Sequence, residues 1–327
     1  NIEAGSGIVT LNRIIIDGNQ AFQGGGSYAD ASLILTNSVI SNNTATTGGG
    51  GGLYGVNFSS TYTLSNITIS GNTAPGTNAD GGGIINQGMM VINNATIVNN
   101  TANRRGGGFI LPGGVTTIIS NSIIADNTAG IQGSDCYTGV FEITASYSLL
   151  KDAAGCSFTP ASSNNITGQD PKLNVLEYLG ATYVHYPQYD SPVIDAGNNA
   201  TCEAADQTGD LRPMGPACDI GAVEYVSPGV VLNANSSGPG SLPWVYSHSF
   251  GNITFAPSLS GQTIILTSPI VLTNTTTIDG YSLASPLTIS GGGSTFLFEV
   301  NSGVYATLSR INIVDGHNAF DGGAIYN

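Results

Sequence analysis

The sequence has little positive charge and no long apolar run. Only 7 of its 327 residues are Lys or Arg, against 21 Asp or Glu, so the formal net charge is -14. This charge has the wrong sign for neutralising phosphates or anionic lipid headgroups, and we expect neither nucleic acid nor a membrane surface as a partner. No apolar run approaches the roughly 20 residues of a membrane-spanning helix. We expect any leader or anchor to lie outside this sequence.

The sequence is also poor in the residues that build long helices. Charged residues make up only 9% of the chain, whereas Gly alone contributes 46 residues, and Asn, Thr, Ser, Ile and Val are abundant. These residues favour turns and strands. With 40% hydrophobic residues the chain can still bury a sizeable core. The composition therefore predicts an all-β fold.

One phrase recurs along the first part of the chain. It is typified by the residues from Leu64 to Ala74, Leu-Ser-Asn-Ile-Thr-Ile-Ser-Gly-Asn-Thr-Ala, and it places a marker asparagine near its end. Successive markers are 24, 29, 28 and 27 residues apart, and a glycine run follows the first four of them. The markers are Asn19, Asn43, Asn72, Asn100 and Asn127.

A period of this length with short β-branched runs indicates one coil of a parallel β-solenoid. Successive coils lie about 4.8 Å apart, so equivalent residues form columns. We expect Ile and Val to fill the interior and the five marker asparagines to form a hydrogen-bonded ladder of side-chain amides. The glycines would allow the tight corners of each coil.

The four cysteines fall into two local pairs, Cys136 with Cys156 and Cys202 with Cys218. This spacing favours two disulfides and an oxidising compartment. The alternatives are four free thiols or a zinc site, but the sequence has no Cys-x-x-Cys and its three histidines lie far from the pairs.

Several segments resemble a known group of proteins. The Gly-Gly-Gly-Ile-Ile-Asn run ending at Asn86 is similar to the right-handed parallel β-helix proteins of bacterial surfaces. Five later motifs resemble the choice-of-anchor type of closing module: Asp170-Pro-Lys-Leu, the run from Ser191 to Asn198, Asp206-Gln, Arg212-Pro, and the run from Cys218 to Tyr225. The resemblance implies a right-handed parallel β-helix with a surface location.

The order of the segments suggests an end followed by a beginning. We expect a parallel β-helix over residues 1–135, a disulfide-bonded closing module over 136–226, a linker or start module over 227–252, and the start of a second β-helix over 253–327. The final Gly-Gly-Ala-Ile-Tyr-Asn resembles the first half of a coil, and joining Asn327 to Asn1 would place 30 residues between Gly316 and Asn19. Copies would therefore join end to end through Asn1, Ile2, Ile8, Ile325, Tyr326 and Asn327.

Other candidate sites have plainer alternatives. Asp206, Asp210 and Asp219 surround Arg212 in sequence and could bind Ca²⁺, which takes six to eight oxygen ligands; an internal network of Arg212 with carboxylates is the alternative. Trp244 could offer a platform for sugar rings or pack as a cap. Arg104 could touch an acidic sugar or be solvated.

These patterns predict an extracellular structural or adhesive protein that self-associates, with no cofactor other than the Ca²⁺ considered above. Parallel β-helices also serve polysaccharide lyases, which need stacked acids or a calcium cluster with a base. At the positions one and two residues before each marker asparagine, no two neighbouring coils both carry a carboxylate. We therefore expect that the protein is not an enzyme. A carbohydrate-binding surface module is the first alternative and a lyase the second.

Overall fold

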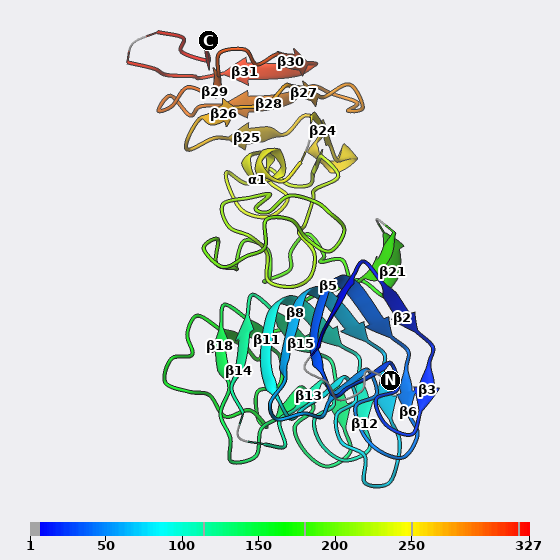
Figure 1. Cartoon of the computed structure of the whole chain (residues 1–327). Coiled ribbons are helices and arrows are strands. Elements are labelled where there is room, and N and C mark those ends of the chain that lie inside the picture. Colours follow the sequence, from blue (N-terminus) through cyan, green and yellow to red (C-terminus); the bar gives the residue numbers. More distant parts are fainter. Residues whose placement is uncertain (1–6, 114, 180, 250, 320) are drawn as a thin grey trace. The chain divides into compact units, whose positions relative to one another are not determined.

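The computed structural model describes residues 7–113, 115–179, 181–249, 251–319 and 321–327. They fall into two compact units, Asn1–Tyr225 and Val226–Asn327. In both units, short strands pair in parallel with the equivalent strands of the next coil (Figure 1). The predicted all-β parallel solenoid is therefore confirmed.

The first unit has three parallel sheets, of which the ten-stranded one bends within each coil at residues such as Asn37 and Asn66. The ten-stranded sheet contains β1 (Ile8–Asn12), β2 (Ile15–Asp17), β5 (Ser32–Ser41), β8 (Thr61–Ser70), β11 (Met89–Val98), β14 (Thr117–Ser120), β15 (Ile123–Ala125), β18 (Thr144–Ser146), β19 (Leu149–Leu150) and β20 (Ile166–Thr167). The second contains β4 (Ser27–Ala29), β7 (Leu53–Gly55), β10 (Ile84–Asn86), β13 (Phe109–Ile110) and β17 (Cys136–Tyr137). The third contains β3 (Gln20–Ala21), β6 (Thr44–Ala45), β9 (Thr73–Ala74), β12 (Thr101–Ala102) and β16 (Thr128–Ala129).

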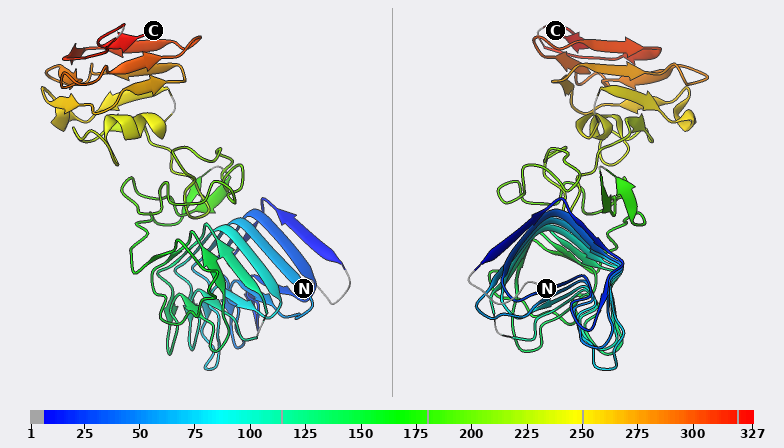
Figure 2. Two further views of the ribbon diagram at one scale, coloured as in Figure 1. Left: turned by 90° about the vertical axis from the view of Figure 1, so that its left-hand side faces the viewer. Right: turned by 45° about the vertical axis from the view of Figure 1, so that its right-hand side comes forward.

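Each coil of the first unit turns at three corners, which the right-hand view of Figure 2 shows nearly end on. One corner carries a glycine with positive φ, such as Gly24 at 60° or Gly50 at 72°. A side chain at Gly50 would also lie 2.8 Å from the Cβ of Tyr54, so this corner needs glycine on both counts. Inside the coil, alternate strand residues such as Leu64 and Ile92 form one buried apolar core.

Parallel pairing continues past residue 135, where the sequence analysis placed the end of the β-helix. Cys136 pairs with Phe109, and Leu149 pairs with both Ile123 and Ile166. The inward positions of these later coils remain apolar, so the core extends with them. The disulfide loop thus lies within the solenoid.

Residues 170–225, which we call the docked segment, lie against the outer face of the ten-stranded sheet. The segment contains an antiparallel hairpin, β21 (Glu177–Leu179) with β22 (Thr182–Val184), and is otherwise loop. Its Val193 and Ile220 pack with Ile123 of the sheet, and Gln207 accepts a hydrogen bond from Thr68 Oγ1 at 2.7 Å. This cover explains why the second halves of β8 and β11 are buried on both faces.

The second unit is a shorter parallel solenoid with its own core. Its helical elements are α1 (Leu242–Ser247) and the 3₁₀ turn Pro257–Leu259. Its sheets contain β23 (Val230–Val231), β24 (Asn252–Phe255), β27 (Thr276–Asp279) and β30 (Ala306–Ser309); β25 (Thr263–Ile265), β28 (Leu287–Ser290) and β31 (Ile311–Val314); and β26 (Ile270–Leu272), β29 (Phe298–Val300) and β32 (Ile325–Tyr326). The region predicted from sequence as a linker or start module, 227–252, contains the strand β23 and the helix α1.

Candidate functional site

The five marker asparagines form one continuous ladder through the first unit. The Nδ2 of each donates to the Oδ1 of the next over 2.9–3.0 Å, from Asn19 through Asn43, Asn72 and Asn100 to Asn127. The same Oδ1 atoms accept the backbone N–H groups of the preceding asparagines. Asn43, Asn72 and Asn100 are completely buried. The ladder therefore supplies partners to polar groups that would otherwise be costly inside the solenoid.

The ladder ends on a carboxylate that the sequence analysis did not single out. Asp135 Oδ1 accepts from both N and Nδ2 of Asn127, and its Oδ2 accepts from Asp152 N at 2.7 Å. In the next coil the ladder position is occupied by Ala153, which has no amide. Burial raises the pKa of Asp135 to about 6, although its hydrogen bonds oppose this rise.

The cluster around Arg212 is an internal network within the docked segment. Arg212 Nη1 donates to Glu224 Oε2 at 2.8 Å and to the carbonyl of Asp219, and its Nη2 donates to the carbonyl of Gly221. Arg212 and Glu224 have side chains only 1% exposed. Burial and the neighbouring Glu224 raise the pKa of Asp219 well above its usual range. The geometry matches the Arg–carboxylate alternative of the sequence analysis.

The carboxylates suggested for Ca²⁺ already accept hydrogen bonds. Asp206 Oδ1 accepts the backbone N–H groups of residues 208–210, and its Oδ2 accepts that of Glu224. Asp219 accepts the N–H groups of Asp195 and Tyr225. Within the described ranges, no three His, Cys, Asp or Glu side chains gather in a way that could hold a metal ion.

Both predicted disulfides are confirmed. Cys136 is bonded to Cys156 and Cys202 to Cys218. The first closes a loop between successive coils of the solenoid, and the second closes a loop of the docked segment whose first residues, Cys202 and Glu203, contact Asn94. All four cysteines are thus paired, which excludes free thiols and a cysteine zinc site.

A buried serine–histidine pair joins the docked segment to the solenoid. Ser70 Oγ lies 2.8 Å from His185 Nε2, and His185 Nδ1 lies 2.8 Å from the carbonyl oxygen of Asn174. Burial lowers the pKa of His185, which favours the neutral ring. Both residues are 3% exposed, so the pair is buried between the docked segment and the solenoid.

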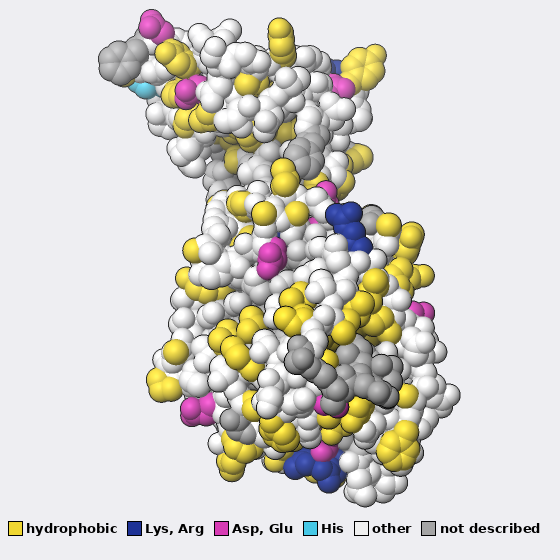
Figure 3. Space-filling view, viewed as in Figure 1, with side chains coloured by type: hydrophobic (Ala, Val, Ile, Leu, Met, Phe, Trp, Pro, Cys, Tyr) yellow, Lys and Arg dark blue, Asp and Glu magenta, His cyan; other side chains and the backbone are white. Residues whose placement is uncertain are grey.

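The residues considered for sugar binding are engaged within the protein. Arg104 and Arg105 both form ion pairs with Asp80, at 2.6 and 3.0 Å, and Arg105 also lies 4.9 Å from the ring centre of Tyr137. Trp244 stacks on His248 with ring centres 4.3 Å apart and packs against the core of the second unit. Charged groups are sparse over the face shown in Figure 3.

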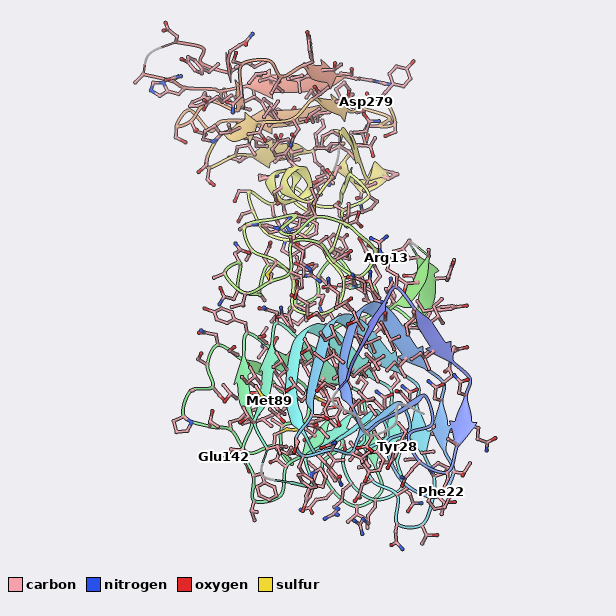
Figure 4. The ribbon with its side chains drawn as sticks, viewed as in Figure 1. Arg13, Phe22, Tyr28, Met89, Glu142 and Asp279 are labelled. Carbon is pink, nitrogen blue, oxygen red and sulfur yellow. A yellow bond between two sulfur atoms is a disulfide. The ribbon has the colours of Figure 1, made fainter. Side chains whose placement is uncertain are left out.

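The first described coil of the first unit and the last strand of the second unit carry exposed apolar groups. In the first coil of the first unit, Ile8 is 66% and Ile15 44% exposed. In the last strand of the second unit, Ile325 is 41% and Tyr326 45% exposed. Figure 4 shows Arg13 and Tyr28, both from that first coil. Of the residues expected to form the association ends, Asn1 and Ile2 lie outside the described residues.

No family model, curated protein or solved structure matches this chain. In the part of the chain that the structure describes, no helix is long and apolar enough to cross a membrane.

Proposed function

We propose that this protein is an extracellular structural element whose open solenoid ends mediate self-association. In this function it builds a stalk, fibre or adhesive surface by end-to-end stacking. The supporting observation is that, among the described residues, the terminal strands β1 and β32 each pair on one side only, and their coils carry half-buried core residues. An exposed edge of this kind is a template for pairing with another chain.

The apolar side chains of these end coils support the proposal. Val9, Leu11, Ile14 and Ile16 belong to the first coil and are only partly buried, although they pack on the core. Their equivalents in the next coil, such as Leu33 and Leu35, are 0–1% exposed because a coil covers them on each side. A further coil stacked on this end would bury the remaining area, which is favourable at roughly 25 cal/mol per Å².

The two disulfides support an oxidising, extracellular location. A surface of bacterial type, as the resemblance implies, remains part of the proposal. We further propose that the role is not enzymatic and needs no metal ion, because Asp206 and Asp219 accept internal hydrogen bonds and the Ser70–His185 pair is buried. Removal of Ca²⁺ with a chelator should leave self-association unchanged.

A single substitution in β1 tests the role of the open edge. Arg13 N–H donates to Thr36 O in the next coil, and N–H directions alternate along a strand, so the N–H of Thr10 faces the open side. Thr10→Pro removes that outward donor and no bond within the unit. Sedimentation velocity and negative-stain electron microscopy should show assemblies of the unmodified chain and of the control Thr10→Ser, and monomers of Thr10→Pro.

Self-association should depend on ionic strength, because the chain carries a formal net charge of -14. Like charge opposes association of copies, and screening within about 10 Å at 0.1 M salt weakens this repulsion. The assemblies should therefore grow as ionic strength rises. A chain that stays monomeric at every concentration and ionic strength would refute the proposed function.

A further inference from the structure

If copies associate as in the proposed function, on which this inference rests, the two different ends of the chain are suited to meet each other. The last coil of the second unit has the same corner pattern as the first coil of the first unit. Residues with positive φ mark the corners: Arg13, Gly18 and Gly24 in the first coil, at 56°, 69° and 60°, and Arg310, Asp315 and Gly322 in the last, at 52°, 49° and 68°. The step from Arg13 to Gly18 equals the step from Arg310 to Asp315, and the glycine corner then follows in both coils.

The inward columns of the two coils match as well. When Arg310 is aligned with Arg13, Ala306 and Leu308 correspond to Val9 and Leu11. In the same alignment, Ile311 and Ile313 correspond to Ile14 and Ile16. Every one of these positions is apolar. Leu308, Ile311 and Ile313 pack on the core of the second unit but are only partly buried, as are the four positions of the first coil. Each coil therefore lacks the apolar neighbour that the other offers.

The glycine corner gives the stack a direction. The N–H groups of residues 24–27 all donate to carbonyls of the next coil, at 2.9–3.1 Å, and the same pattern recurs at residues 81–84 and 106–109. Among the described residues, the carbonyls of residues 23–26 on the opposite side accept no hydrogen bond, and the N–H groups of residues 322–324 donate none. One end thus presents a row of acceptors and the other a row of donors.

This polarity favours contact between unlike ends. Two first coils facing each other would bring carbonyl rows together, and two last coils would bring N–H rows together, which leaves buried polar groups unpaired. Contact between unlike ends lets residues 322–325 donate to residues 23–26, just as residues 24–27 donate to residues 49–52 within the first unit.

The outward tyrosine column also continues across the two ends. Tyr28 and Tyr54 are neighbours in adjacent coils, with ring centres 5.6 Å apart in an edge-to-face arrangement. Tyr326 occupies the equivalent place in the last coil, because it follows the corner glycine Gly322 at the same spacing as Tyr28 follows Gly24. A depression of about 550 Å³ lined by residues 21–28, among them Phe22 and Tyr28, lies at the open side of the first coil (Figure 4). It is the place that the equivalent segment of another copy would cover.

We propose that residues 306–326 of one copy form the coil directly preceding residues 8–29 of the next copy. The strands pair in parallel, with Ala306, Thr307 and Leu308 beside Val9, Thr10 and Leu11. The Leu308 N–H then donates to the Thr10 carbonyl, and the Thr10 N–H donates to the Ala306 carbonyl. Such an interface joins two different surfaces, so it leaves a free end after each addition and produces open filaments.

Paired cysteines test this register. Thr10 and Thr307 are exposed and point outward from their strands. In the proposed register their Cα atoms lie about 4.8 Å apart, within the range that a disulfide spans. The chain carrying Thr10→Cys and Thr307→Cys should give a ladder of covalent oligomers after oxidation, resolved by electrophoresis without reductant.

A matched pair shifted by two residues is the control. Thr10→Cys with Ser309→Cys keeps both side chains on the same face, but the Cα atoms would lie about 8 Å apart, beyond the reach of a disulfide. This pair should give no ladder. Each single variant alone should give no covalent dimer, and a mixture of the Thr10→Cys and Thr307→Cys chains should give one dimer band.

The outcomes separate this inference from the proposed function. If sedimentation shows assemblies but the Thr10–Thr307 pair gives no ladder, or the shifted pair gives an equal one, the register is wrong and self-association stands. A covalent dimer of the Thr10→Cys chain alone would show contact between like ends and overturn the inference. If the unmodified chain does not associate at all, both proposals fail.

Discussion

Replacing Asn72 by alanine perturbs the centre of the asparagine ladder. The Asn72 side chain accepts from N and Nδ2 of Asn43 and donates to the carbonyl of Ile40 and to Oδ1 of Asn100, over 2.9–3.0 Å. None of these atoms has ready access to water, since Asn43, Asn72, Ile40 and Asn100 are all 0% exposed. The substitution therefore removes a partner from four buried polar groups, of which Asn43 Nδ2 keeps the carbonyl of Ile16 and Asn100 Oδ1 keeps the backbone N–H of residue 72.

The size of the effect follows from that count. Each buried donor or acceptor left without a partner costs about 1–3 kcal/mol. Because two of the four groups keep another partner, we expect Asn72→Ala to lower the free energy of unfolding by about 2–4 kcal/mol. Asn19, at the exposed end of the ladder, donates only to Asp17 and Asn43. Water can replace its amide there, so Asn19→Ala should cost about 0.5–1 kcal/mol.

Urea unfolding of the full chain, followed by two probes, measures both variants. Far-ultraviolet circular dichroism reports the strands of both units, whereas the single tryptophan, Trp244, lies in the second unit. The circular-dichroism transition of Asn72→Ala should move to lower urea, and its tryptophan transition should not move. Equal destabilisation by Asn19→Ala and Asn72→Ala would refute the idea that buried ladder partners carry the stability.

Three further predictions concern the first unit. Burial raises the pKa of Asp135 to about 6 from 3.8, so the folded state holds an extra proton between these values. The free energy of unfolding should therefore fall by about 2.4 kcal/mol as the pH rises from 4 to 7, and unfolding of Asp135→Asn should lack this slope. Arg212→Met strands a buried carboxylate and should lower the free energy of unfolding by about 3–5 kcal/mol, read as a lower Tm, whereas exposed Arg13→Met should change it by less than about 0.5 kcal/mol. Replacing Cys136 and Cys156 together by Ala removes their bridge, which spans 20 residues, and leaves Cys202–Cys218 in place. Urea titration of this variant should show a loss of about 3 kcal/mol.

The repeated coils could be predicted because each coil repeats the chemistry of its neighbour. The marker spacing predicted the columns, and the ladder from Asn19 to Asn127 lies in one of them. A second column was missed. Asn37, Asn66 and Asn94 have φ between 48° and 50° and form another corner of the coil. The sequence analysis did not assign them a role, although each stands the same number of residues before its marker, and that constant spacing was the available signal.

The docked segment could not be placed from sequence. Its contacts join residues far apart along the chain, such as Thr68 with Gln207 at a separation of 139, and they have no period. The substitution of Asp135 for a ladder asparagine was equally hidden, because Asp135 lies outside the repeated phrase and reaches Asn127 through a loop. Periodicity thus predicts what repeats, whereas unique tertiary contacts need the structure.

The docked segment also limits how the solenoid can change in length. A coil bonds mainly to the coils before and after it, so whole coils could be duplicated or lost without altering either open end. The docked segment restricts such changes because it spans two adjacent strands. Gln207 is hydrogen-bonded to Thr68 in β8, and Ala222 is hydrogen-bonded to Thr96 in β11. A coil inserted between these strands would pull the two bonds apart, whereas one inserted before β5 would leave both intact. Evolution or design could therefore lengthen this solenoid near its first coils, while the docked segment fixes the number of coils beneath it.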